Sequence, residues 1–106
     1  HKYPYFENSW IWFEKILFIY CDYNNSAQVR QAACYGLGIF AEHTPLAMRK
    51  PENVICWIEK LRSAHMIPHN PKRHMSIYLY CRDNIVAAMG KIIKTHMSLI
   101  DIQPFL

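Results

Sequence analysis

The chain lacks most of the features that mark phosphate-binding loops, membrane spans and secreted proteins. Only three of its 106 residues are glycine. Gly36 and Gly38 lie inside an apolar helical pattern, outside any GxGxxG or GxxxxGK[ST] motif. No apolar run reaches the ~18 residues of a membrane helix, and no signal peptide is recognisable. We therefore expect close helix packing at these glycines and no membrane anchorage.

Neither the cysteines nor the histidines form a metal-binding or catalytic motif. The cysteines are too far apart for a zinc pair and lie in apolar helical windows, where we expect buried, reduced thiols: Cys21, Cys34, Cys56 and Cys81. Three histidines lie in or beside one loop, but no Cys, Asp or Glu stands between positions 62 and 81 to complete a ligand set: His65, His69 and His74. The sequence thus predicts no metal, no cofactor and no enzymatic activity.

Charge is modest as well. The formal net charge is +4, and the basic residues are spread along the chain. The densest groups are Arg49-Lys50 and Lys72-Arg73. Pairs of this kind are usual on solvated loops, so the charge pattern does not favour nucleic acid as a partner. A helical nucleic-acid-binding module that uses these four residues stays as a third alternative.

Apolar, helix-forming sequence is abundant, because 52% of the residues are hydrophobic. Proline and turn residues separate four helical windows, placed roughly at residues 5–21, 27–42, 52–66 and 75–96. Ser26 is suited to cap the second window, and Pro51 to open the third. The fold class predicted is all-α.

The second window carries a stripe of apolar and small residues at helical spacing: Val29, Ala32, Ala33, Gly36, Leu37 and Phe40. Small side chains on a helix face allow another helix to approach closely. A weaker version of the stripe returns 52 positions later, which adds Asn84, Ala88 and Gly90 to the expected packing positions. Asn84 is polar, so we expect it to be hydrogen-bonded to an adjacent loop or helix end.

The first and third windows are related in the same way. The segment that begins at Trp12 returns at Trp57, 45 positions later. The chain therefore divides into two helix-turn-helix units, residues 1–45 and 46–98, and residues 99–106 begin a following unit. Units of this size match the HEAT period of about 40–47 residues better than the shorter TPR and ankyrin periods. Because both ends are apolar, we expect a fragment of a longer α-α superhelix of HEAT repeats.

The segment Val29–Ala33, read VRQAA, with Tyr35-Gly36-Leu37-Gly38 after it, closely resembles a second HEAT helix of the importin β-type karyopherins. The importin β3-like branch is the closest in pattern. The next unit is similar through Asp83-Asn84 and residues 88–94, so the resemblance covers roughly residues 26–106. Two features depart from the family. Asn24 stands where the HEAT pattern has Asp, and the chain is net basic where the family is commonly acidic.

The resemblance implies a segment of a nuclear transport receptor that shuttles between cytoplasm and nucleus. The implied partners are protein cargo, the Ran GTPase in its GTP form, and Phe-Gly repeats of the nuclear pore. The second helix of each unit would line the concave face, and we expect partner contacts at flanking residues: Gln31, Tyr35, Glu42, Lys91 and Lys94. Aromatic residues of the first helix, such as Trp12 and Phe13, either pack on a preceding repeat or receive pore Phe side chains. The main alternative is a HEAT scaffold for another protein assembly.

Overall fold

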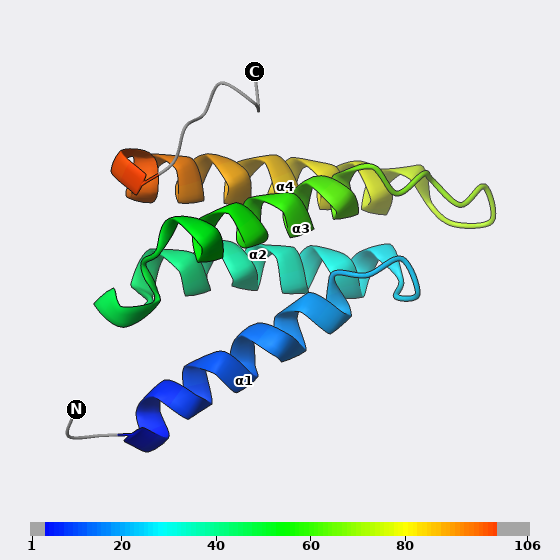
Figure 1. Ribbon diagram of the computed structural model, residues 1–106. Helices are drawn as coiled ribbons and strands as arrows, with labels where there is room; N and C mark the ends of the chain where they lie inside the picture. Colours follow the sequence, from blue (N-terminus) through cyan, green and yellow to red (C-terminus); the bar gives the residue numbers. More distant parts are fainter. Residues whose placement is uncertain (1–3, 100–106) are drawn as a thin grey trace.

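The computed structural model describes the backbone of residues 4–99 and the side chains of residues 8–99. Within that part the chain is all-α and contains no strand. The elements are α1 (Pro4–Tyr20), α2 (Ala27–His43), the 3-10 turn η1 (Leu46–Met48), α3 (Pro51–His65), α4 (Met75–His96) and the 3-10 turn η2 (Met97–Leu99) (Figure 1). The helix bounds differ from the expected windows by at most one residue. The expected start of a following unit at 99–106 lies, apart from Leu99, outside the described residues.

Local sequence explains where the helices begin. The Ser26 hydroxyl accepts a hydrogen bond from the Val29 amide at 3.3 Å, so α2 starts with a side-chain cap. Pro51 occupies the first turn of α3, where its missing amide hydrogen costs nothing. No side chain caps α4, which follows His74 at the end of the proline-containing loop. The first amides of α4 therefore lack side-chain acceptors.

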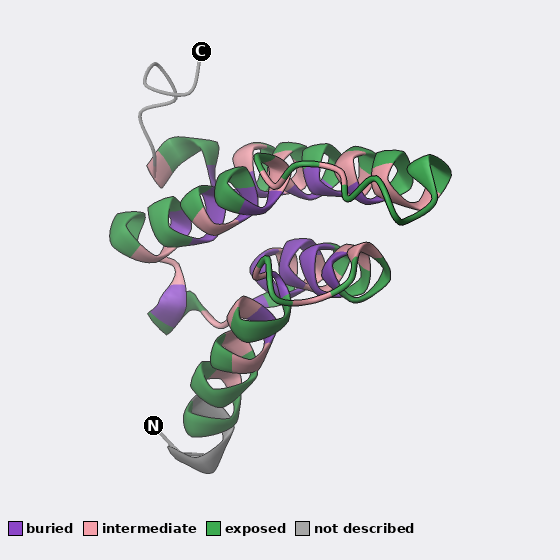
Figure 2. Ribbon diagram, turned by 90° about the vertical axis from the view of Figure 1, so that its right-hand side faces the viewer, coloured by how far each residue is buried: buried purple, intermediate pink, exposed green. Residues whose placement is uncertain are grey.

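The four helices form two antiparallel pairs, and α2 is the central element. It packs against α4 more extensively than against α1 or α3. Because α2 and α4 both begin at the end of the molecule that carries the α1–α2 and α3–α4 loops, they run parallel to each other (Figure 1). Seen from the side, α1 diverges from the other helices, and burial is concentrated where the helices face one another (Figure 2).

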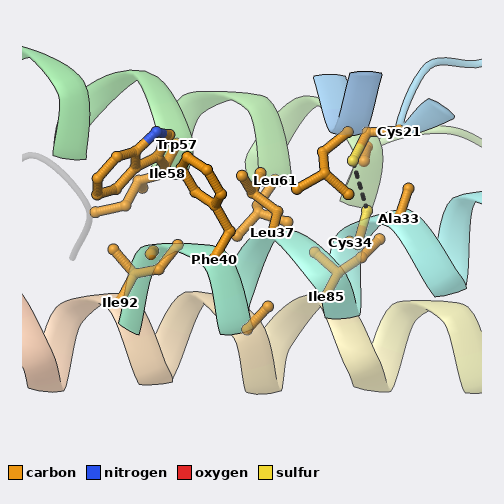
Figure 3. Packing of buried hydrophobic residues seen from close by; sticks show 14 of the residues in the cluster. Cys21, Ala33, Cys34, Leu37, Phe40, Trp57, Ile58, Leu61, Ile85 and Ile92 are labelled. Carbon is orange, nitrogen blue, oxygen red and sulfur yellow. Dashed lines mark hydrogen bonds between the residues drawn. The ribbon is translucent and has the colours of Figure 1, made fainter. Parts of the chain in front are cut away.

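The core lies between α2, α3 and α4. Trp57, Ile58 and Leu61 of α3 point toward Leu37 and Phe40 of α2 (Figure 3). Together with Val54 they form the inward face of α3 that the spacing of these residues indicates, and Trp57 is fully buried. The Phe40 and Trp57 rings meet edge to face with 5.8 Å between their centroids. The tight ring packing fixes how α3 sits on α2.

One hydrogen bond ties α1 to α3. The Trp57 indole nitrogen donates to a Glu14 carboxylate oxygen at 2.6 Å. A buried indole needs such a partner, because an unmet buried donor costs roughly 1–3 kcal/mol. Beside Trp57, whose ring centroid is 5.7 Å away, a ring nitrogen of His96 lies 2.7 Å from the Ala41 carbonyl oxygen and joins α4 to α2.

Only some of the packing positions expected from the stripe are buried. Ala33, Leu37 and Ala88 are buried, and Gly36 is half-buried against Leu17. Three other expected positions are not packed within the described chain: Val29 is 40% exposed, Ala32 is exposed, and a Cβ at Gly90 would meet no atom within 4 Å. The reason is that α2 is contacted from two sides, by α1 and α3 and by α4, so its buried surface is rotated away from Val29 and Ala32.

The rotated surface includes residues that the stripe omitted. Arg30, Cys34, Gly38 and Ala41 are buried on α2. Gly38 is the closest approach to α4, since a Cβ built there would lie 2.9 Å from the Ala88 Cβ and 3.1 Å from the Ala88 Cα. Close packing at a glycine is thus found at Gly38, and not at Gly90.

Other side chains depart from expectation for similar local reasons. Asn84 is half-buried and donates to the Tyr80 carbonyl at 3.0 Å, one turn back on its own helix, rather than to a neighbouring loop. Cys56 is exposed, whereas the other three cysteines are buried. On α1, Trp12 is 67% exposed. Phe13 is 49% exposed, although its ring meets the Phe40 ring of α2 edge to face with 6.0 Å between their centroids.

Candidate partner-binding surface

The outer surface of the parallel pair α2 and α4 carries the residues expected to bind a partner. Gln31, Glu42 and Lys91 are half-buried, and Tyr35 and Lys94 are exposed. They come from two helices that lie side by side, because Gly38 lets α2 approach α4. A surface shared by both second helices is therefore present.

Two of these residues touch across the helix pair. The Lys91 ammonium lies 5.6 Å from the centroid of the Tyr35 ring, the geometry of a cation–π contact. Tyr35 is 53% exposed, so part of its side chain stays accessible. The contact places an aromatic ring and a cation together on the α2–α4 surface.

Gln31 belongs to an open hollow of about 320 Å³ at the start of both helices. Its walls are Gln28, Ser76, Ile77 and Tyr80. Amide, hydroxyl and phenol groups line the hollow, and these groups both donate and accept hydrogen bonds. Such a lining suits a peptide backbone better than a reacting group.

The remaining two expected residues lie near the other end of the helices and make separate contacts. A Glu42 carboxylate oxygen is 3.2 Å from the His43 ring nitrogen, and the Glu42 carbonyl accepts from Arg49 at 3.4 Å. Lys94 is exposed in the last turn of α4. The structure thus joins Tyr35 to Lys91, places Gln31 in the hollow, and leaves Glu42 and Lys94 apart from them.

Sequence reasoning missed an exposed apolar stripe on α4. Met75, Leu79 and Val86 are 51%, 49% and 56% exposed. Their spacing puts them on a different side of α4 from the buried Cys81, Ile85 and Ala88. A helix with two apolar stripes has two surfaces that favour packing, which is the signal that could have identified these residues.

Two of the buried thiols, Cys21 and Cys34, are in direct contact. The Cys34 thiol donates to the Cys21 sulfur at 3.4 Å (Figure 3). The contact lowers the pKa of Cys21 and raises the pKa of Cys34, which burial raises further. Burial likewise raises the pKa of Cys81. Raised pKa values keep the Cys34 and Cys81 thiols protonated, which suits buried side chains that serve in packing.

The loop histidines are engaged in separate contacts. Arg82 donates from Nε to the His65 ring at 3.3 Å, and a His69 ring nitrogen lies 2.9 Å from the Arg73 carbonyl oxygen. Burial, together with the charge of Arg82, lowers the pKa of His65. Among residues 8–99, no three His, Cys, Asp or Glu side chains are grouped as they would need to be to hold a metal. None of the described helices combines the length and apolarity needed to cross a membrane.

Comparison with models of protein families, with curated proteins and with solved structures finds no match to this chain. The function is therefore inferred from the residues and their geometry. These provide a polar and aromatic surface on a parallel helix pair, flanked by exposed apolar side chains.

Proposed function

We propose that the chain is a pair of HEAT-type repeats, residues 1–45 and 46–98, that binds a protein partner as part of a helical solenoid. The observation that carries the proposal is the arrangement of α2 and α4. They run parallel and in close contact at Gly38 and Ala88, and each is paired with an antiparallel helix. Stacked helix pairs of this kind bury a continuous core between neighbouring units.

Apolar surfaces on both flanks support the stacking proposal. On the α1 side, an open hollow of about 420 Å³ is lined mainly by apolar side chains, including Leu17, Tyr20, Val29 and Ala32. On the α4 side lies the stripe of Met75, Leu79 and Val86. In a solenoid each flank is covered by the next helix pair, which explains why Val29 and Ala32 are apolar but exposed here.

The resemblance of the α2 sequence to importin β-type karyopherins extends the proposal to nuclear transport. In such a receptor, the second helices α2 and α4 would face cargo or Ran-GTP. The contacts would be made by Gln31, Tyr35 and Lys91. The Tyr35–Lys91 pair and the hollow at Gln31 lie on one surface of α2 and α4, as the proposal requires. Cytoplasm and nucleus are the compartments that the proposal implies.

The proposal is tested by a pull-down of Ran, with the full-length protein as bait. We expect Ran loaded with a GTP analogue to be retained and Ran-GDP to be lost. Equal retention of both forms, or of neither, would refute the transport-receptor proposal. If both are lost while another protein binds through the same surface, the chain belongs to a different HEAT scaffold.

A pair of variants locates the contact surface. Tyr35→Ala removes an exposed ring on the α2–α4 surface, and Leu46→Ala removes a side chain, 83% exposed, in η1. We expect Tyr35→Ala to weaken partner binding at least tenfold and Leu46→Ala to change it less than twofold, because interface energy concentrates in few aromatic anchors. Equal effects would place the contact elsewhere.

A further inference from the structure

A polar cavity lies between the α1–α2 loop and the α3–α4 loop, at one end of the molecule. Its volume is about 470 Å³. One wall comes from the loop before α2 and the first turn of α2, residues 23–28, and the other from the loop before α4 and its first turn, residues 67–78. In Figure 1 this is the end where α2 and α4 both begin. The cavity borders the hollow at Gln31, with which it shares Gln28 and Ile77 as lining residues.

The charged side chains that line the cavity are all basic. Two arginines, Arg30 and Arg73, and two histidines, His69 and His74, line it, and no Asp or Glu does. The nearest carboxylate in sequence, Asp22, accepts a hydrogen bond from the Tyr23 amide at 2.8 Å and forms no ion pair with either arginine. The described side chains therefore leave this positive charge without a counter-charge.

Arg30 is the most unusual residue of the cavity. Its side chain is only 6% exposed, which is rare for an arginine without a carboxylate partner. The guanidinium donates from Nη1 to the Asn25 carbonyl at 2.6 Å, and its Nε–H has no hydrogen-bond partner among the described residues. Burial raises the pKa of the adjacent Cys81 thiol and outweighs the opposing effect of Arg30, so Cys81 stands beside the guanidinium as a neutral thiol and not as a counter-charge. A buried, unpaired cation is costly, so a bound anion would be strongly favoured.

The backbone contributes to the same preference. The cavity is lined around the start of α2 by Ser26, Ala27 and Gln28, and around the start of α4 by His74 and Ile77. A helix N-terminus carries free amides and roughly half a positive charge. Two parallel helices of 17 and 22 residues therefore direct their positive ends at one cavity. The α4 end has no side-chain cap that would compete with an anion.

We propose that this cavity binds a phosphate-type oxyanion, held by Arg30, Arg73 and the first amides of α2 and α4. Arginine donors and helix N-terminal amides are the groups that proteins use most often for phosphate. The phosphate is either free or carried on a serine or threonine of a bound protein. The site does not depend on membership of a transport receptor, so either proposal can fail while the other stands.

The test is a titration of the chain with inorganic phosphate, followed by amide NMR. At constant ionic strength, phosphate should shift the amides of Ala27, Gln28 and Ile77 with a saturating curve, and chloride should not. Shifts that are equal in phosphate and chloride, or that are confined to the lysine-bearing surfaces, would overturn the proposal.

Matched variants separate a built site from general positive charge. Arg73→Gln removes a cavity cation and should raise the Kd for phosphate about tenfold, as expected for one charge-assisted hydrogen bond. Lys72→Gln removes the neighbouring exposed cation, which does not line the cavity, and should change Kd less than twofold. Equal effects of the two variants would refute the site. Arg30→Met should abolish saturable shifts without loss of the folded NMR spectrum.

The source of the phosphate is resolved by a second ligand. A phosphoserine peptide that binds at least as tightly as inorganic phosphate, while its unphosphorylated form does not bind, assigns the site to a modified protein. Binding of inorganic phosphate alone assigns it to the free ion. Failure of both ligands would overturn the proposal.

Discussion

Gly38→Ala is the substitution whose effect the structure determines most sharply. Gly38 faces Ala88 across the α2–α4 contact, and an added Cβ would lie 2.9 Å from the Ala88 Cβ and 3.1 Å from its Cα. One of the two obstructing atoms is backbone, so no change of rotamer relieves the overlap. The helices must separate, which loosens the packing of Leu37 and Ile85 in the core.

Two opposing contributions set the change in the free energy of unfolding. Alanine is better than glycine within a helix by about 1 kcal/mol, whereas overpacking a core contact costs about 1–3 kcal/mol. With a backbone atom involved we take the upper end of the cost, so the free energy of unfolding should fall by about 2 kcal/mol. For a domain of this size that corresponds to a Tm lower by about 8–15 °C.

The other two glycines are internal controls for the same change. A Cβ at Gly36 would meet only the Leu17 Cδ2, at 3.1 Å, and that flexible side chain can shift. Gly36→Ala should therefore be close to neutral. A Cβ at Gly90 meets nothing, so Gly90→Ala should raise Tm by about 4–8 °C through helix propensity alone.

Thermal and urea unfolding of the three variants, followed by circular dichroism, provides the measurement. The double variant Gly38→Ala with Ala88→Gly moves the methyl group to the other helix and should be more stable than Gly38→Ala alone. If Gly38→Ala unfolds within about 2 °C of the parent, a shift worth less than ~0.5 kcal/mol, the close approach of α2 and α4 is refuted.

Three further predictions concern single contacts. The pKa of His65 is lowered by burial and by Arg82, so its neutral form stabilises the fold at pH above about 6.5, and this stability is lost as pH falls toward the folded-state pKa. The unfolding free energy of the parent relative to His65→Gln should therefore decrease on acidification, and a constant difference would contradict this. Cys56 is the exposed cysteine, so a thiol reagent should label it first in the native chain, with the other cysteines reacting only on unfolding; mass spectrometry of the labelled peptides decides this. Glu14→Ala leaves the Trp57 indole unpaired and should lower the unfolding free energy by about 1–3 kcal/mol, but by much less in a Trp57→Phe background, where no donor remains; equal losses in both backgrounds would show that the hydrogen bond is not the cause.

Helices α3 and α2 show what an apolar period in the sequence does and does not determine. The spacing of Val54, Trp57, Ile58 and Leu61 predicts one buried face of α3, and all four are fully buried, because α3 packs on one side only. Val29 and Ala32 have the same apolar character and spacing but are exposed, since the side of α2 that bears them is not covered by another described helix. Periodicity identifies a face that favours packing and does not identify the element that packs on it.

The candidate sites depend on distant parts of the chain. Tyr35 meets Lys91, and Arg30 shares its cavity with Arg73, across separations in sequence that no local pattern spans. Arg30 is buried and donates to the Asn25 carbonyl just before its own helix, and no local sequence pattern marks it as a buried cation.

The sequence by itself determined the four helices and their ends, because capping, proline placement and apolar period act over a few residues. It also determined that α2 has small residues suited to close helix contact. Only the tertiary structure decided that Gly38 is the contact point, that α2 and α4 run side by side, and that their positive ends converge on one cavity. These are properties of the rotation and direction of packed helices, which depend on the sum of many weak contacts rather than on any local motif.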